Sequence, residues 1–390
     1  MPTAVELMLS AVRTQVCGGE RCSFGKLSVD MMQELYAISK SQDLAHIVAV
    51  ELEQQGLLSE TDAEIAAKFR KQQMIAILRY ERINYELEAI CKVLEEKKIP
   101  HIPLKGSVLR RYYPEPWMRT SADIDLLIHS NDLETSVRFL IERLKYRQEA
   151  SGTDYDLSLF SPSGVHVELH YGMITEDRAA NSCAVLEKFW QYSKPEPSWN
   201  YRYITEPSMF YFYHIAHLVK HFENSGCGVR FFLDLWVLNH CLELDSKEKE
   251  QLLDEGGLLR FSKAATLLSE VWFGNSKHTK ITQNMADYVF CGGIYGTQHH
   301  RMVTQNIKKR GTIGYAFSRV FPSYRTMKHI YPFLEAHKWL LPFFHVRRWC
   351  RIVFCGGLKH SMEEIKYSAD IDKNQKEHTK SMLRTLGLLE

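Results

Sequence analysis

The sequence has no apolar run long enough to cross a membrane. Its most apolar stretches are FFLDLWVLNHCLEL, which Asp234 interrupts, and WLLPFFHVRRWC, which His345–Arg348 interrupt, whereas a spanning helix needs about 20 apolar residues. The first stretch, MPTAVELMLSAVR, carries the acidic Glu6 and lacks the basic start and apolar run of a signal peptide. We therefore predict no transmembrane segment and a cytoplasmic location.

Paired zinc-binding cysteines and a strong charge of one sign are also missing. The nine cysteines include the loosely spaced pairs Cys17/Cys22 and Cys350/Cys355 but no paired CxxC motifs. We expect reduced and mostly buried thiols. The net charge of +2 is too small to indicate a partner by itself. With 390 residues, the chain is long enough for two or three domains.

Changes in hydrophobic periodicity divide the chain into four regions. Residues 1–98 repeat apolar residues at helical spacing. In residues 99–175, short apolar runs alternate with glycine and proline turns, which predicts strands and short helices. Helical patterns return over residues 176–360, and residues 361–390 form a polar tail. The expected fold class is α+β, with a small mixed-sheet core between two helical regions.

The core region has a recognisable order of elements. A short strand in IPLKG (102–106) precedes an apolar strand in ADIDLLI (122–128), and a helix follows over residues 131–144. The stretches DYDLSLF (154–160) and VHVELHY (165–171) alternate around SPSG, which predicts a hairpin.

The motif SADID occurs twice, at Ser121–Asp125 and at Ser368–Asp372. The second copy has no apolar strand around it, and we interpret its aspartates as solvated charges. The first copy leads into LLI, so Asp123 and Asp125 project from one face of a buried strand. Two like charges buried together are costly unless cations neutralise them. The first copy is therefore the candidate metal site.

Two neighbouring features complete this candidate site. Gly106 and Ser107 lie at a strand-to-helix turn, where backbone N–H groups and a hydroxyl can hold phosphate. Glu168 lies in VHVELHY with its apolar neighbours on the opposite face, and Asp156 on the partner strand is the rival third carboxylate. Three carboxylates suit two Mg²⁺ ions, with Mn²⁺ as the alternative.

Glycine-serine, then Asp-x-Asp, then a third carboxylate on a later strand resembles the polymerase-β-type nucleotidyltransferase superfamily. More narrowly, IPLKGSVLRRYYPEPWMRTSADIDLLI resembles an uncharacterised bacterial nucleotidyltransferase family, in which a Lys-Gly turn, a Tyr-Pro and an Arg precede an Asp-Ile-Asp-Leu-Leu strand. Flanking helical stretches fit as well: LYAISKSQDLAHIVAVEL, HLVKHF…GVRFFLDLWVL and FPSYRTMKHIYPFLEAHKWLLPFFHVRRW. The resemblance covers roughly residues 30–355.

The resemblance implies a polymerase-β-like nucleotidyltransferase core. Such an enzyme moves a nucleoside monophosphate from an NTP to an acceptor and releases pyrophosphate. By this resemblance, Asp123, Asp125 and Glu168 bind the metals, and Gly106 and Ser107 hold the triphosphate. The acceptor, the nucleobase and catalytic competence stay open.

Further side chains are candidates for substrate contact. Lys105 and Arg119 flank the turn and the strand and either meet the β- and γ-phosphates or are surface cations. Downstream, three histidines lie on one face of a predicted helix and two charged residues follow them; we expect this group to line the cleft opposite the metals. Its members are His214, His217, His221, Arg230 and Asp234.

Residues 301–360 hold twelve Lys and Arg against one acidic residue, Glu335, with interleaved aromatics, which indicates a polyanion contact or a packed basic face.

The rival functions are a metal-dependent glycosyltransferase using a nucleotide-sugar and a catalytically silent nucleotide-binding protein. Crowded carboxylates also predict that neutralising Asp125 does not destabilise the metal-free fold.

Overall fold

The computed structural model describes most of the chain. The described residues are 2–152, 155–173, 180–224, 227–292, 320–322, 324, 327, 331–335, 337–354 and 373–389. The chain divides into two compact units, residues 1–220 with 227–294, and residues 221–226 with 295–390. The second SADID copy lies outside the described residues. The division of the chain into four regions stays a prediction.

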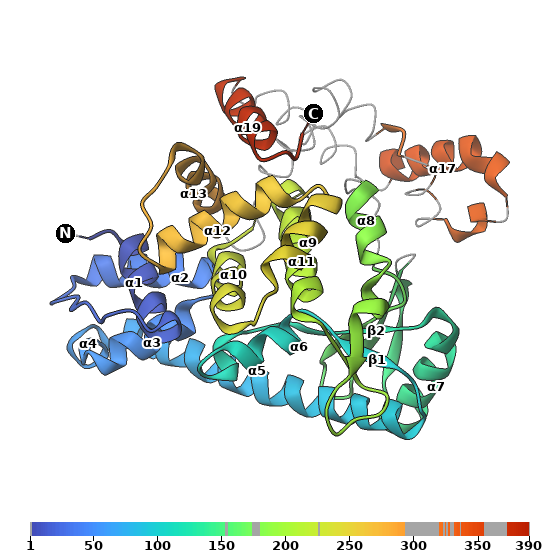
Figure 1. Ribbon diagram of the computed structural model, residues 1–390, viewed down its shortest axis with the longest axis horizontal. Helices are drawn as coiled ribbons and strands as arrows, with labels where there is room; N and C mark the ends of the chain where they lie inside the picture. Colours follow the sequence, from blue (N-terminus) through green and yellow to red (C-terminus); the bar gives the residue numbers. More distant parts are fainter. Residues whose placement is uncertain are drawn as a thin grey trace. The chain divides into compact units, whose positions relative to one another are not determined.

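The N-terminal part of the chain forms helices between Ala4 and Glu96, joined by loops. The helices are α1 (Ala4–Cys17), α2 (Val29–Ser41), α3 (Ala45–Gln54), α4 (Leu57–Glu60) and α5 (Ala63–Glu96). The long helix α5 begins where the Asp62 carboxylate accepts hydrogen bonds from the N–H groups of Glu64 and Ile65. It contains no glycine or proline and ends shortly before Pro100. Figure 1 shows α5 extending along the base of the first unit.

A mixed five-stranded sheet follows α5. Its strands are β1 (His101–Pro103), β2 (Asp123–Ile128), β3 (Arg147–Gly152), β4 (Asp156–Phe160) and β5 (His166–His170). Their spatial order is β1-β2-β5-β4-β3. β2 and β5 are parallel, and the other neighbours are antiparallel. The mixed sheet and the β4–β5 hairpin are confirmed, whereas the polar strand β3 was not predicted.

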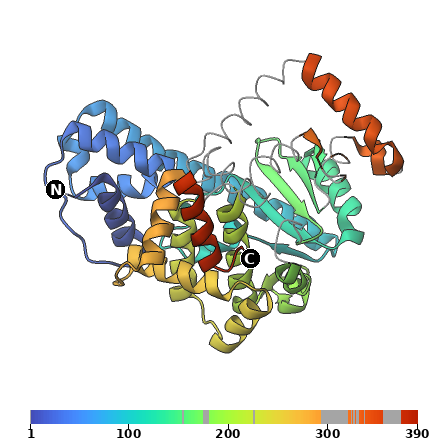
Figure 2. The ribbon, with the colours of Figure 1, turned by 90° about the horizontal axis from the view of Figure 1, so that it is seen from above.

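One face of the sheet is apolar and covered by helices. Ile124 and Leu126 of β2 and Val167 and Leu169 of β5 are buried in one cluster with side chains of α5 and α7 (Leu133–Leu144). Figure 2 shows α7 beside the sheet. Because successive strand side chains point to opposite faces, the alternate residues of β2 and β5 project away from this core.

Short helical segments connect β1 to β2, and further helices follow later in the chain. The remaining elements of the first unit are α6 (Gly106–Leu109), η1 (Arg110–Tyr112), η2 (Pro116–Met118), η3 (Ser130–Asp132), α8 (Ala180–Leu186), η4 (Phe189–Tyr192), β6 (Ser193–Pro195), β7 (Tyr203–Thr205), α10 (Val229–Cys241), α11 (Ser246–Glu255), α12 (Leu259–Phe273) and α13 (Lys280–Gly292). Helix α9 (Pro207–Asn224) begins in this unit.

The second unit has a small core of its own. Its elements are η5 (Pro332–Glu335), η6 (Lys338–Leu340), α17 (Leu341–Phe354) and α19 (Lys373–Thr385). Met327, Leu334 and Phe344 form a buried cluster. Among the residues with a described placement, no helix combines the length and apolar character needed to cross a bilayer.

Candidate active site

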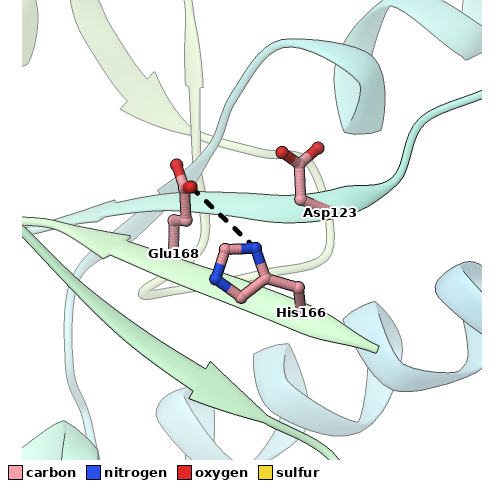
Figure 3. Close-up of side chains that lie close together, drawn as sticks. All are labelled: Asp123, His166 and Glu168. Atoms are coloured by element: carbon pink, nitrogen blue, oxygen red, sulfur yellow. Dashed lines mark ion pairs between the residues drawn. The ribbon is translucent and has the colours of Figure 1, made fainter. Parts of the chain in front are cut away.

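The face of the sheet opposite the core carries five polar side chains on two neighbouring strands. In the parallel pairing of β2 and β5, Asp123 lies opposite His166 and Asp125 lies opposite Glu168. His170 follows on the same side of β5, because side chains alternate along a strand. Figure 3 shows Asp123, His166 and Glu168 together on this face. The parallel register therefore brings carboxylates from two distant parts of the chain into one place.

These five side chains form two overlapping sets of potential metal ligands. One set is Asp123, His166 and Glu168, and the other is Asp125, Glu168 and His170; in each set the ligand atoms lie within 4.8 Å of one another. His166 Nδ1 lies 3.9 Å from one oxygen of Glu168, and His170 Nε2 lies 3.4 Å from the other. Within the described part of the chain, no other group of three His, Cys, Asp or Glu side chains has its ligand atoms this close together. Glu168 is common to both.

Lys105 reaches this face from the turn between β1 and α6. Its φ is 44°, a conformation that residues other than glycine seldom adopt. The preceding Leu104 N–H donates to the carbonyl of Asp125 at 3.0 Å, which ties the turn to β2. The ammonium nitrogen of Lys105 lies 2.6 Å from Oδ1 of Asp125 and 4.0 Å from Oε2 of Glu168. The lysine thus supplies positive charge directly among the carboxylates.

The two aspartates differ in their ionisation. Burial disfavours a charge on Asp125, but the ammonium of Lys105 and the hydrogen bond from His170 outweigh it and hold the pKa of Asp125 well below its usual value. Burial and the neighbouring Asp125 raise the pKa of Asp123. For His170, burial opposes the charge, yet the hydrogen bonds to Asp125 and Glu168 raise its pKa. Asp125 is thus ionised and has two donors, Lys105 and His170. The repulsion between the two carboxylates instead disfavours the charge on Asp123.

The glycine of the turn is required by close packing. A Cβ at Gly106 would lie 2.9 Å from Cβ of Ser121 and 3.8 Å from Nη1 of Arg119. The next residue, Ser107, is 3% exposed, and its N–H donates to the carbonyl of Leu104 at 3.1 Å. Its hydroxyl is buried and has no hydrogen-bond partner among the described residues. That hydroxyl is the unsatisfied polar group of the turn.

Arg119 lies beside the Lys-Gly turn, and its side chain is paired with groups inside the protein. Its Nε donates to Oδ1 of Asp234 at 2.6 Å, and its Nη1 donates to the carbonyl of Thr120. The hydroxyl of Tyr113 donates to the same oxygen of Asp234 at 2.7 Å, and Asp234 has no exposed surface. These contacts make Arg119 an internal tie between β2 and α10. Its contact with phosphate stays a prediction.

Arg230 of α10 makes a second tie to the same loop. Its Nη1 lies 2.5 Å from Oδ2 of Asp43 and 3.2 Å from Oγ1 of Thr120, which also donates to Asp43. Arg230 and Asp234, four residues apart on one helix, therefore both fix the segment that leads into β2. Their predicted place on a substrate cleft stays untested.

The three histidines of α9 are not part of either ligand set. His214 is buried, and its Nε2 lies 3.1 Å from the carbonyl oxygen of Phe231. The ring of His217 lies 5.8 Å from the ring of Phe231. His221 lies near the end of the same helix. The proposed lining of a cleft by these side chains stays a prediction.

Comparison with known protein families identifies the chain at the family level. The family described as uncharacterised nucleotidyltransferase matches residues 30–274, which is more than half of the chain. The protein belongs to this family. The resemblance predicted from the sequence is thereby confirmed over that range, while the segments after residue 274 lie outside the match. No curated protein matches the chain.

The two histidines of β5 were not predicted as site residues from the sequence. Their signal was present in VHVELHY, where His166, Glu168 and His170 alternate with apolar residues. The structure also bears on the third carboxylate. Asp156 of β4 pairs with His170 but belongs to neither ligand set, whereas Glu168 belongs to both. Glu168 as the third carboxylate stays a prediction, which its place in both ligand sets supports.

The structure describes only part of the basic segment, residues 301–360. Residues 301–319 lie outside the described residues, and α17 lies within them. The guanidinium of Arg347 lies 5.6 Å from the ring of Tyr331 and 5.8 Å from that of Phe344, which is a packing contact. On the exposed side of α17, Phe343 is 62% exposed. The polyanion contact stays a prediction.

Proposed function

We propose that this protein transfers a nucleoside monophosphate from an NTP to an acceptor, with divalent cations held by Asp123, Asp125 and Glu168. In this reaction the oxygen of an acceptor hydroxyl loses its proton to solvent and forms a bond to the α-phosphorus. The bond from that phosphorus to the bridging oxygen breaks, and pyrophosphate leaves with the electron pair. The observation that carries the proposal is the parallel register of β2 and β5, which gathers the carboxylates next to the Lys-Gly turn. Family membership supports the same reaction class.

The donor set fits a divalent cation. Three carboxylates favour Mg²⁺ or Mn²⁺. The imidazoles of His166 and His170 within the same sets add nitrogen donors, which transition-metal ions accept more readily than Mg²⁺ does. A bound cation would neutralise charge on the phosphates and activate the attacking oxygen.

The surrounding side chains have supporting roles in this proposal. His170 orients Asp125 through a 2.8 Å hydrogen bond. Before substrate binds, the ammonium of Lys105 neutralises part of the negative charge of the carboxylates. When substrate binds, the ammonium contacts a phosphate. The hydroxyl of Ser107, which has no partner among the described residues, completes the phosphate-binding turn after Gly106. Catalysis is then mainly positioning and charge neutralisation.

A glycosyltransferase is the less favoured candidate. Nucleotide-sugar binding on an open sheet relies on a series of parallel strands joined by helices. In the described sheet, only β2 and β5 pair in parallel. A silent nucleotide-binding protein would have the same arrangement of side chains on the sheet but would not catalyse transfer. A measurement of turnover therefore distinguishes it from an enzyme.

The test is incubation with each α-labelled NTP, Mg²⁺ or Mn²⁺, and a cell extract as the source of acceptors. We expect label to move into a small molecule, a protein or RNA, with release of pyrophosphate, and the labelled fraction identifies the acceptor class. The Asp125→Asn variant is the control and should transfer no label.

Two outcomes would overturn the proposal. Release of a nucleoside diphosphate from UDP-sugars, without use of NTPs, would support a glycosyltransferase. Binding of NTP and metal without any turnover, under all four nucleotides, would support a silent binding protein.

A further inference from the structure

Helix α17 has apolar side chains on two of its sides. Phe344 is 6% exposed and is buried with Met327 and Leu334 in the small core of the second unit. Phe343 and Val346 of the same helix are 62% and 51% exposed. A helix that covers a core from one side needs a single apolar face. The exposed apolar side chains therefore need an explanation other than this core.

The exposed apolar side chains form a stripe along one side of the helix. The stripe consists of Trp339 in η6 and of Phe343, Val346 and Cys350 in α17, all of them exposed. Successive members are separated by four, three and four residues, and residues at these spacings are neighbours on one helix face. Trp339 is 76% exposed. An exposed apolar face of this kind is typical of an interaction site.

Positive charge accompanies the stripe. The sequence of α17, LPFFHVRRWCRIVF, contains Arg347, Arg348 and Arg351 and no Asp or Glu. Lys338 and Arg347 are exposed, and the guanidinium carbon of Arg347 lies 5.6 Å from the centre of the Tyr331 ring. An arginine in such a position covers apolar surface with its stem while its charged end stays in water. The partner of this surface should therefore be both apolar and negatively charged.

Three kinds of partner bind apolar or basic surfaces, and the stripe fits one of them best. Single-stranded RNA binds cations and aromatic rings on which its bases stack, but Val346 and Cys350 of the stripe have no ring. A second copy of the chain would bring basic residues of like charge together, which opposes pairing. An anionic lipid bilayer combines acidic headgroups with an apolar interior, and basic helices with exposed Trp and Phe lie at such interfaces.

We infer that η6 and α17 bind the surface of an anionic lipid bilayer, with the stripe inserted among the headgroups. Lys338 and the arginines of α17 then contact the lipid phosphates. With 14 residues, α17 is about 21 Å long, which is shorter than the hydrocarbon core of about 30 Å, so the helix lies on the bilayer and does not cross it. The inference is independent of the proposed function, because α17 lies outside the residues that match the nucleotidyltransferase family.

The experiment measures sedimentation of the full-length protein with vesicles of phosphatidylcholine alone and of an equal mixture of phosphatidylcholine and phosphatidylglycerol. We expect binding to the anionic vesicles to be at least about tenfold tighter and to weaken as salt is added. The test variant is Phe343→Gln with Val346→Gln. The matched control is Met74→Gln with Leu78→Gln, because these two side chains of α5 are each 57% exposed. The test variant should bind anionic vesicles at least about tenfold more weakly than wild type, and the control should bind as wild type does.

Arg347→Gln separates the contribution of charge from that of the apolar stripe. This variant should bind anionic vesicles about fivefold more weakly than wild type, because each basic residue near the bilayer surface contributes about that factor. Its weak binding to phosphatidylcholine vesicles should not change. Arg347→Lys keeps the charge and should keep most of the affinity. Equal affinities of Arg347→Gln and Arg347→Lys for the anionic vesicles would show that the charge does not contribute, which contradicts the inferred contact with lipid phosphates.

Quenching of tryptophan fluorescence by lipids with brominated acyl chains provides a second readout. Anionic vesicles that contain these lipids should quench wild type, and Trp339→Phe should lose most of the quenching while it still sediments with the vesicles. Absence of vesicle binding by wild type would overturn the inference, and so would binding of single-stranded RNA without binding of vesicles or equal affinities of the test variant and the control. Should the test variant fail to fold, the quenching decides: equal quenching of wild type and Trp339→Phe would overturn the inference.

Discussion

The ammonium nitrogen of Lys105 lies 2.6 Å from Oδ1 of Asp125, and Nε2 of His170 lies 2.8 Å from the same oxygen. Asp125 therefore has two donors on one oxygen before any metal or substrate binds. Lys105 acts as a counter-cation that belongs to the protein. A metal that binds through Asp125 has to compete with it.

We expect Lys105→Met to destabilise the metal-free protein and to strengthen metal binding. Loss of a partly buried ion pair should lower the free energy of unfolding by about 2 kcal/mol in EDTA. Mn²⁺ alone should then raise the melting temperature of the variant more than that of wild type, because the competing ammonium is gone. Lys92→Met, an exposed lysine of α5, is the control. Equal Mn²⁺ responses would show that Lys105 does not compete.

The two aspartates should respond differently to neutralisation. Asp125→Asn removes the partner of Lys105 and His170 and should lower the melting temperature in EDTA, whereas Asp123→Asn removes repulsion and should leave it equal or higher. Both should reduce label transfer by at least roughly 100-fold. Thermal melts in EDTA and the label assay measure these effects.

This expectation for Asp125 reverses the one drawn from the sequence. The sequence showed crowded carboxylates, but it did not show that Lys105 and His170 neutralise Asp125. A higher melting temperature for Asp125→Asn than for wild type would mean that these contacts do not stabilise the fold.

Gly106→Ala tests the close approach of the turn to β2. The added Cβ would lie 2.9 Å from Cβ of Ser121, so the turn or the start of β2 must shift, at a cost of about 2 kcal/mol. Ser121→Gly removes the opposing atom, so Gly106→Ala should cost less in that background. Urea unfolding of the four proteins in the cycle measures the coupling. Strictly additive losses would contradict a direct clash.

A buried histidine predicts acid sensitivity away from the site. His101 has no exposed surface, and its Nδ1 lies 2.9 Å from the carbonyl oxygen of Ile99. Burial lowers its pKa from 6.5 to about 4. Between these values the unfolded chain binds a proton that the folded protein does not, so stability is full above the upper value and falls as the pH is lowered through this window.

His101→Gln should remove this part of the pH dependence. Between about pH 7 and about pH 5, wild type should lose about 2 kcal/mol more stability than the variant. Urea unfolding at both pH values gives the difference, and other histidines cancel in the comparison. Equal losses in the two proteins would show that His101 titrates normally in the folded state.

Much of the site could be predicted from local patterns. The alternation in ADIDLLI and VHVELHY placed Asp123, Asp125 and Glu168 on polar strand faces, and the structure gathers them on one face. The same alternation contained His166 and His170, but half-buried histidines have many ordinary roles, so the pattern alone did not single them out. The periodicity of a strand shows which side chains share a face, but it does not show which of them have a chemical role.

Long-range partners could not be predicted from one sequence. Arg119 and Asp234 lie 115 residues apart, and nothing in either local pattern indicates their pairing. Strand β3, with the polar sequence RQEASG, gave no apolar signal and is held by pairing with β4.

The parallel pairing of β2 with β5 also predicts an order of events when the chain folds. β4 and β5 can form as a local hairpin, but β5 can join β2 only after a crossover that contains α7 and β3 has closed, and contacts of long sequence separation form late. A growing chain that has passed β2 but not β5 carries two aspartates without their other ligands. In pulse-labelled hydrogen exchange during refolding, amides of α5 should gain protection before those that join β2 to β5. Affinity for a metal would then appear in the last stage of folding, when the carboxylates of β2 and β5 come together.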